Sequence, residues 1–171
     1  MHKSITAMIC ITLICICGCD CISKDSAKQK IAPDFRLEDT DHQRFYLNQY
    51  QGRIVVIVFW STWCIVCKRY LNELEEANAG FEDKGIKLVS ILIDPENSDT
   101  LSEILKDSVH INYPVLLDRN MTVMKRFNVK DMPTTIIIGK DGEIVMEKVG
   151  YNLSTITQIG NRLDMLMENQ E

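Results

Sequence analysis

Two apolar runs with almost no polar positions occupy the middle of the chain. Residues 54–60 (Ile-Val-Val-Ile-Val-Phe-Trp) and 86–93 (Ile-Lys-Leu-Val-Ser-Ile-Leu-Ile) are rich in Val and Ile and do not alternate with polar residues. Strands covered on both faces have this pattern, because side chains on either face meet apolar neighbours. The two runs therefore predict central strands of a parallel or mixed sheet.

A helical period fills the stretch between these runs. Residues 64–81 carry apolar side chains at steps of three and four: Leu71, Leu74, Ala77 and Phe81. Such spacing gives a helix one face that packs on a core. Further along, Thr100 and Glu103 form a capping-box pair that predicts a second helix, and residues 121–127 predict a short third helix.

Strand and turn patterns mark both ends of the region. Residues 35–38 and 45–47 predict an N-terminal β-hairpin around a polar turn. Residues 134–138 and 144–149 predict a second hairpin with an Asp-Gly turn, and a final helix begins near Ser154. This order of elements predicts an α/β fold with helices packed on a central mixed sheet.

The N-terminus carries a targeting pattern. Its apolar stretch, residues 5–17, is shorter than the ~20 residues of a membrane span and has the length of a signal-peptide core. The run Ile-Cys-Gly-Cys at 16–19 resembles a bacterial lipobox. It predicts a lipoprotein signal peptide over residues 1–18 and a lipid on Cys19, with plain secretion or an uncleaved anchor as the alternatives.

A polar tether is predicted over residues 19–30, and one exported, folded domain over residues 31–171. The chain of 171 residues is 46% apolar, which suffices for a substantial core. Its net charge is −5 and it has no basic run, so we expect no nucleic-acid partner. The expected contact with the membrane is the lipid anchor.

Cysteine placement indicates the chemistry. Of seven cysteines, five fall within the first 21 residues, which leaves Cys64 and Cys67 in the folded region. A fold held together by several disulfides would spread its cysteines more widely. The three histidines have no metal-ligand spacing with the pair, so we expect no metal. The redox-active disulfide Cys64–Cys67 would be the chain's own redox group, with no further cofactor.

The pair stands where a strand passes into a helix, in the run Trp-Cys-Ile-Val-Cys at 63–67. At a helix N-terminus the free N–H groups and the macrodipole favour a thiolate, and only the thiolate attacks disulfides. Cys64 is therefore the predicted nucleophile, and Cys67, one turn on, the resolving thiol. Ile65 and Val66 offer no group that stabilises a thiolate, so the pair should be reducing, nearer about −270 mV than about −120 mV.

A second motif, Met-Pro-Thr at 132–134, stands immediately before a predicted strand. Proline cannot donate to a sheet ladder and belongs at the start or edge of a strand. An X–Pro bond can also be cis at little cost. Pro133 is therefore either an ordinary strand-start proline or a cis proline, and its position after a Cys-x-x-Cys helix favours the second interpretation.

These motifs together resemble the TlpA/ResA-like branch of the thioredoxin superfamily. The resemblance covers residues 31 to the C-terminus and includes Ala-Pro-Asp-Phe at 32–35, Phe-Trp-Ser-Thr-Trp-Cys-x-x-Cys at 59–67, Met-Pro-Thr-Thr at 132–135 and Asp-Gly at 141–142. It implies a thioredoxin-like fold with a helical insertion at about 95–115. It also implies tethering to the membrane outside the cytoplasm.

The resemblance further implies reduction of disulfides in exported proteins, including apocytochrome c before haem attachment, with a membrane thiol reductant as electron source. Pro133 would be cis and face Cys64, and the Met132 backbone would pair with a substrate strand. Trp63 and Thr134 would complete the substrate-binding surface.

The chain departs from the family at three places. The family commonly has Pro between the cysteines, where this chain has Ile65 and Val66. It usually has Glu and Pro three and five residues after the second cysteine, where this chain has Tyr70 and Asn72. Thioredoxin itself has a buried acid at the position of Val58. The proton acceptor for the second thiol is therefore not evident from the sequence.

Three other functions are alternatives to disulfide reduction. A thiol peroxidase would carry Pro-x-x-x-Thr-x-x-Cys around its cysteine, where this chain has a different run at 59–64. A copper-delivery protein would space its cysteines one residue wider and supply a histidine. In a non-catalytic tethered binding protein, the two cysteines would form a purely structural disulfide.

Overall fold

The structure is a computed structural model of the chain, and it describes residues 30–93, 101, 105 and 108–168. The predicted signal peptide, Cys19, Thr100 and Glu103 lie outside these residues, as does the predicted tether except for Lys30. Within the described part, no helix is both long and apolar enough to cross a membrane.

A five-stranded mixed sheet forms the centre of the fold, as predicted. Its strands lie in the order β5-β4-β3-β6-β7, with β3, β4 and β5 parallel and β6 and β7 antiparallel to their neighbours. The bounds are β3 Val55–Trp60, β4 Lys87–Leu92, β5 Val115–Leu117, β6 Thr134–Ile138 and β7 Ile144–Val149.

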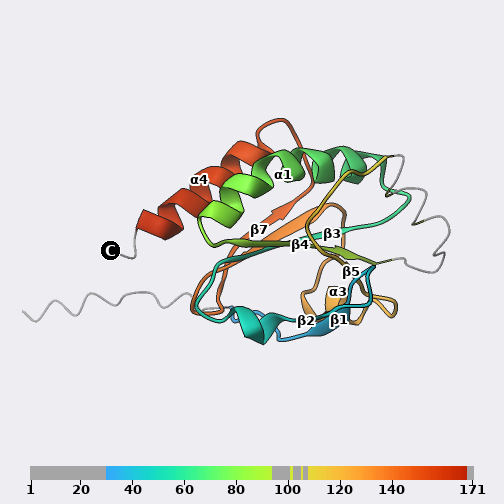
Figure 1. Cartoon of the computed structure of the whole chain (residues 1–171), viewed down its shortest axis with the longest axis horizontal. Helices are drawn as coiled ribbons and strands as arrows, with labels where there is room; N and C mark the ends of the chain where they lie inside the picture. Colours follow the sequence, from blue (N-terminus) through green and yellow to red (C-terminus); the bar gives the residue numbers. More distant parts are fainter. Residues whose placement is uncertain (1–29, 94–100, 102–104, 106–107, 169–171) are drawn as a thin grey trace, which may run out of the picture.

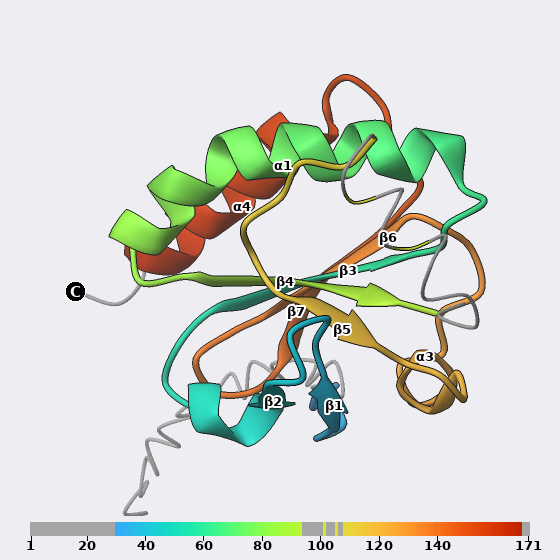
Figure 2. The same ribbon diagram turned by 45° about the vertical axis from the view of Figure 1, so that its right-hand side comes forward.

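Helices and a hairpin cover the two faces of this sheet (Figures 1 and 2). On one face lie α1 (Ile65–Asp83) and α4 (Thr155–Glu168). On the other lie α3 (Thr122–Arg126) and the predicted N-terminal hairpin of β1 (Arg36–Glu38) and β2 (Arg44–Tyr46), which forms a separate two-stranded sheet. A short 3-10 helix, η1 (Leu47–Tyr50), follows the hairpin and was not predicted.

Strand β3 shows why its sequence does not alternate. Val56 and Val58 pack in the cluster with the residues of α1, whereas Ile57 and Phe59 pack in the cluster with the hairpin and α3. All six residues of the strand are buried. The apolar run therefore predicted both the strand and its central position.

The predicted helical insertion at about 95–115 needs a correction at its C-terminal end. Residues 108–114 are described and contain no helix. Their backbone donates instead to side chains of α1: the His110 N–H to Asn72 Oδ1 at 2.8 Å, and the Asn112 N–H to Glu75 Oε2 at 2.9 Å. These contacts hold the segment alongside α1 and take the place of helical hydrogen bonds.

Candidate active site

The two cysteines of the folded region lie at the first turn of α1 and form a disulfide with a Cα–Cα distance of 5.2 Å. Cys64 is the N-cap residue, and its Sγ accepts the Cys67 N–H at 3.3 Å. Cys64 is 6% exposed and Cys67 is fully buried. An attacking thiolate would therefore meet the sulfur of Cys64 first.

The local chain path explains this position. Strand β3 ends at Trp60, and a turn in which the Cys64 N–H donates to the Ser61 carbonyl at 3.2 Å leads into the helix. The first amides of α1 have no helical carbonyl to bind, so they present partial positive charge to Cys64. After reduction, this environment favours the thiolate of Cys64 over its thiol.

The two tryptophans near the pair occupy opposite environments, as the sequence suggested. Trp60 is fully buried in the core, whereas Trp63 is 70% exposed. Ile65 and Val66, the residues between the cysteines, are also exposed. The disulfide is therefore bordered by an apolar surface that is open to a partner.

The Met-Pro-Thr motif lies at the same end of the sheet as the cysteines. Thr134, the first residue of β6, is paired with Phe59 near the end of β3, and Met132 packs against the apolar cluster that contains Cys64 and Cys67. The Met132–Pro133 peptide bond is cis, the conformation that the resemblance implies. The Pro133 carbonyl accepts the Gly150 N–H at 2.8 Å, which ties the loop to the end of β7.

Met132 and Thr134 differ in what they can offer a substrate. Thr134 is fully buried, and its hydroxyl donates to the Asp131 carbonyl at 2.6 Å, so its side chain holds the loop. Met132 is half-buried, and its backbone N–H and C=O have no hydrogen-bond partner among residues 30–93 and 108–168. The Met132 backbone is thus available for a substrate strand, while the roles of both residues in binding stay predictions.

Sequence reasoning missed the contact that joins the two motifs. The Tyr70 hydroxyl and Thr135 Oγ1 lie 2.6 Å apart, and both residues are fully buried. Burial raises the pKa of Tyr70 well above its usual value, so its hydroxyl stays protonated. In the sequence, Tyr70 stands out only because the family usually has Glu at this position. The two threonines at the start of the otherwise apolar strand β6 are the one signal of a polar partner.

A surface network continues outward from Tyr70. The ring of Tyr151 lies 5.0 Å from that of Tyr70, and the Tyr151 hydroxyl donates to Glu73 Oε1. Glu73 also pairs with Arg69 at 3.1 Å, and this contact raises the pKa of Arg69. Arg69 is therefore engaged on the helix surface.

Val58, at the position of the thioredoxin acid, is fully buried in the apolar cluster that also contains Cys64 and Cys67. A proton acceptor for Cys67 is therefore not supplied from this position. Among the described residues, no group of three or more His, Cys, Asp and Glu side chains is arranged to hold a metal ion.

Comparison with known proteins agrees with this geometry. The chain is 32% identical to the thiol-disulfide oxidoreductase ResA of Bacillus subtilis over 119 residues, which cover 70% of this chain and 65% of the relative. This chain thus aligns with just under two thirds of that protein.

Solved structures share the fold. A thiol:disulfide interchange protein of the thioredoxin family from Chlorobium tepidum superposes with a TM-score of 0.71 at 20% identity, over 82% of this chain and 98% of the other. The exposed lipoprotein thioredoxin Etrx1 of Streptococcus pneumoniae gives 0.66 at 24% identity, over 80% and 99%. The fold is therefore thioredoxin-like.

The match to a family model covers most of the described domain. The AhpC/TSA family model matches residues 29–146, which include both cysteines, the cis proline and every strand up to the middle of β7. With its thioredoxin-like fold and its cysteine pair at the start of α1, the chain belongs to the AhpC/TSA family.

Proposed function

We propose that this protein is a thiol–disulfide oxidoreductase that reduces disulfides of exported proteins outside the cytoplasm. The observation that carries the proposal is the Cys64–Cys67 disulfide at the N-terminus of α1, in which Cys64 keeps 6% exposure and Cys67 is fully buried. The name of the Bacillus subtilis relative supports the reaction class.

The reaction proceeds from the reduced pair in two exchanges. The Cys64 thiolate attacks one sulfur of a substrate disulfide, forms a mixed disulfide and releases the other substrate sulfur as a thiolate. Cys67 then loses its proton and attacks Cys64 Sγ, which releases the second substrate sulfur and closes the Cys64–Cys67 disulfide. The substrate gains two electrons, and a membrane thiol reductant restores the pair by the reverse exchanges.

Substrate binding uses the surface around the pair. The free backbone N–H and C=O of Met132 can pair with an extended substrate segment, as a strand added to a sheet edge does. Trp63, Ile65 and Val66 give that segment an apolar contact. Such binding depends on the substrate's backbone and on apolar side chains in general, not on a particular sequence. It therefore suits unfolded chains such as apocytochrome c, whose backbone is accessible.

Placement at the membrane forms the remaining part of the proposal. A lipid on Cys19, followed by the polar tether, would hold the folded domain at the outer side of the cytoplasmic membrane. The structural relative from Streptococcus pneumoniae is described as an exposed lipoprotein, which supports this arrangement. Labelling with radioactive palmitate, compared between the wild type and Cys19→Ala, tests the anchor.

Trapping of the mixed disulfide tests the reaction. In a Cys67→Ser variant the second exchange cannot occur, so disulfide-linked partners should accumulate on Cys64 in the cell envelope. The matched control, Cys64→Ser with Cys67→Ser, should capture none. Absence of captured partners, together with no acceleration of insulin reduction by dithiothreitol, contradicts the proposal.

The alternatives give different results in the same assays. A thiol peroxidase would consume hydrogen peroxide faster than it reduces insulin. A non-catalytic binding protein would keep its function in the Cys64→Ser variant. We expect slow peroxide consumption and complete loss of insulin reduction in that variant.

A further inference from the structure

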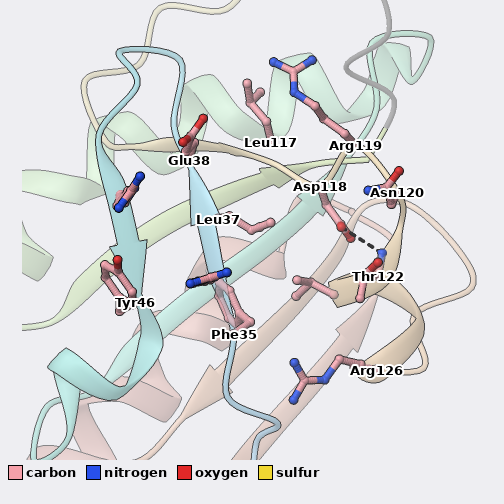
Figure 3. Close-up of a pocket in the computed structure, with 13 residues that line it drawn as sticks. Phe35, Leu37, Glu38, Tyr46, Leu117, Asp118, Arg119, Asn120, Thr122 and Arg126 are labelled. Carbon is pink, nitrogen blue, oxygen red and sulfur yellow. Dashed lines mark hydrogen bonds between the residues drawn. The ribbon is translucent and has the colours of Figure 1, made fainter.

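A recess lies on the face of the sheet opposite α1, between the β1–β2 hairpin and the segment from the end of β5 to α3 (Figure 3). Its volume is about 670 Å³, within the ~300–1,000 Å³ of typical ligand sites. Its base includes the buried side chains of Phe35 and Val123. Four exposed arginines line it: Arg36, Arg44, Arg119 and Arg126.

Neither acid of the recess forms an ion pair with Arg36, Arg44 or Arg126. Asp118 is 1% exposed, and its two carboxylate oxygens accept the backbone N–H groups of Thr122 at 2.9 Å and Met124 at 2.8 Å. The negative charge of Asp118 therefore stabilises the free backbone N–H groups at the start of α3. Figure 3 shows the contact with Thr122 as a dashed line. Glu38, opposite Arg44 in the hairpin register, forms no ion pair within 4.0 Å in the described chain.

Three of the arginines have no anionic partner of their own. Among the described residues, Arg36, Arg44 and Arg126 form neither an ion pair nor a side-chain hydrogen bond. They come from β1, β2 and α3, in a chain whose net charge is −5. Like charges gathered at one recess repel each other, and an external anion removes this repulsion.

We propose that this recess binds a carboxylate-bearing segment of a partner polypeptide. The planar guanidinium group matches a carboxylate with two parallel hydrogen bonds. Figure 3 shows Arg119 and Arg126 on opposite sides of Thr122, so the positive groups are spread around the recess. Several carboxylates along an extended chain fit this spread, with the apolar base in contact with the intervening side chains. A single phosphate ion would need its donors at one point.

The side of the recess formed by Asp118 lies at the same end of the sheet as the cysteines. Asp118 follows the C-terminal end of β5, as Cys64 follows that of the parallel strand β3 after a short turn. An acidic segment bound in the recess would therefore hold the rest of the partner in a fixed orientation relative to the domain. The site is independent of the proposed reaction, since neither cysteine takes part in it.

Binding of a defined peptide tests the site. The probe is a rhodamine-labelled dodecapeptide of alternating Glu and Ala with blocked termini. Its binding to the full chain is measured by fluorescence anisotropy. We expect saturable binding that weakens with salt. The Arg36→Gln/Arg126→Gln variant should bind about tenfold more weakly, because it loses two exposed charge pairs. Lys125→Gln, on the same turn of α3 but outside the recess, should bind within about twofold of the wild type.

Each other outcome overturns the proposal. Equal loss in Lys125→Gln would indicate general charge attraction, and equal binding of a Gln-for-Glu peptide would exclude carboxylate recognition. Binding of inorganic phosphate without binding of the peptide would make this a small-anion site. Thermal melting verifies that each variant is folded. If the double variant has a lower melting temperature than the wild type, the single Arg126→Gln variant replaces it in the binding experiment.

Discussion

The hydroxyl of Tyr70 lies 2.6 Å from Oγ1 of Thr135, and this contact joins the two elements that form the site. Tyr70 follows Cys67 by one helical turn, and Thr135 follows Pro133 by two residues. Because both side chains are fully buried, no water replaces the contact if it breaks. The pair therefore fixes α1 against the start of β6.

Replacing Tyr70 by Phe removes this hydrogen bond and leaves the Thr135 hydroxyl buried without its partner. We expect a loss of about 1–3 kcal/mol in the free energy of unfolding, measured by urea denaturation. The control is Tyr50→Phe, because the hydroxyl of Tyr50 has no hydrogen-bond partner in the described part of the chain. That variant should change stability by less than about 0.5 kcal/mol.

A double variant separates the hydrogen bond from general packing. Thr135→Val removes the second hydroxyl, so Tyr70→Phe/Thr135→Val leaves no unpaired polar group in the core. Its loss of stability should be smaller than the sum of the two single losses by roughly 0.5–3 kcal/mol. Additive losses would show that the two hydroxyls do not interact.

Replacing Trp63 should slow the reduction of protein substrates without changing the stability of the fold. It is 70% exposed, so Trp63→Ala should keep stability within about 0.5 kcal/mol of the wild type. We expect insulin reduction to slow about three- to tenfold, since a large exposed aromatic contributes strongly to protein contacts. The rate with a small disulfide such as oxidised glutathione should stay within about twofold. Equal slowing with insulin and with oxidised glutathione would show that the substitution changes the reactivity of the thiols and not the binding of protein substrates.

Trp60 provides the matched contrast. It is fully buried, so Trp60→Ala should cost about 3–5 kcal/mol of stability through the cavity that it leaves. A small cost, measured by the same urea denaturation, would contradict the core position of this side chain.

The sequence predicted features that depend on neighbouring positions along the chain. The apolar run that contains β3 predicted a strand with both faces buried, and the passage from this run into a helical period placed Cys64 at the start of a helix. Contacts between distant residues had no such pattern. Tyr70 and Thr135 are 65 positions apart, and neither lies in a periodic set that would reveal the other. The arginines of the recess come likewise from separate elements that only the folded chain brings together.

Stability should fall in alkaline solution because of two buried tyrosines. Burial raises the pKa of Tyr70 and of Tyr113 above the usual value of 10.0. The unfolded chain therefore loses these protons first, and stability falls as pH rises above about 10, while below that pH the contribution is complete. Each tyrosine should add a slope of about 1.4 kcal/mol per pH unit. Urea denaturation between pH 8 and 11 measures it.

Tyr113→Phe should remove one of these two contributions and so reduce the alkaline slope. The same variant loses the hydrogen bond from the Tyr113 hydroxyl to the Leu71 carbonyl, 3.0 Å long, so its stability at pH 7 should be lower by about 1 kcal/mol. An unchanged slope above pH 10 would show that this tyrosine ionises equally in both states.

Asn72 should hold the segment before β5 against α1. Its Oδ1 accepts the His110 N–H at 2.8 Å, and its Nδ2 donates to the Ser108 carbonyl at 3.1 Å. Asn72→Ala removes both bonds, so the amide of His110 should exchange with solvent deuterium about tenfold faster or more, because a loss of about 1.4 kcal/mol in local opening energy is a tenfold change. Glu76→Ala, an exposed position on the same helix, is the control and should leave this amide unchanged. Unaltered exchange in Asn72→Ala would mean that the apolar side chains of the segment, such as the buried Val109, hold it in place without the asparagine.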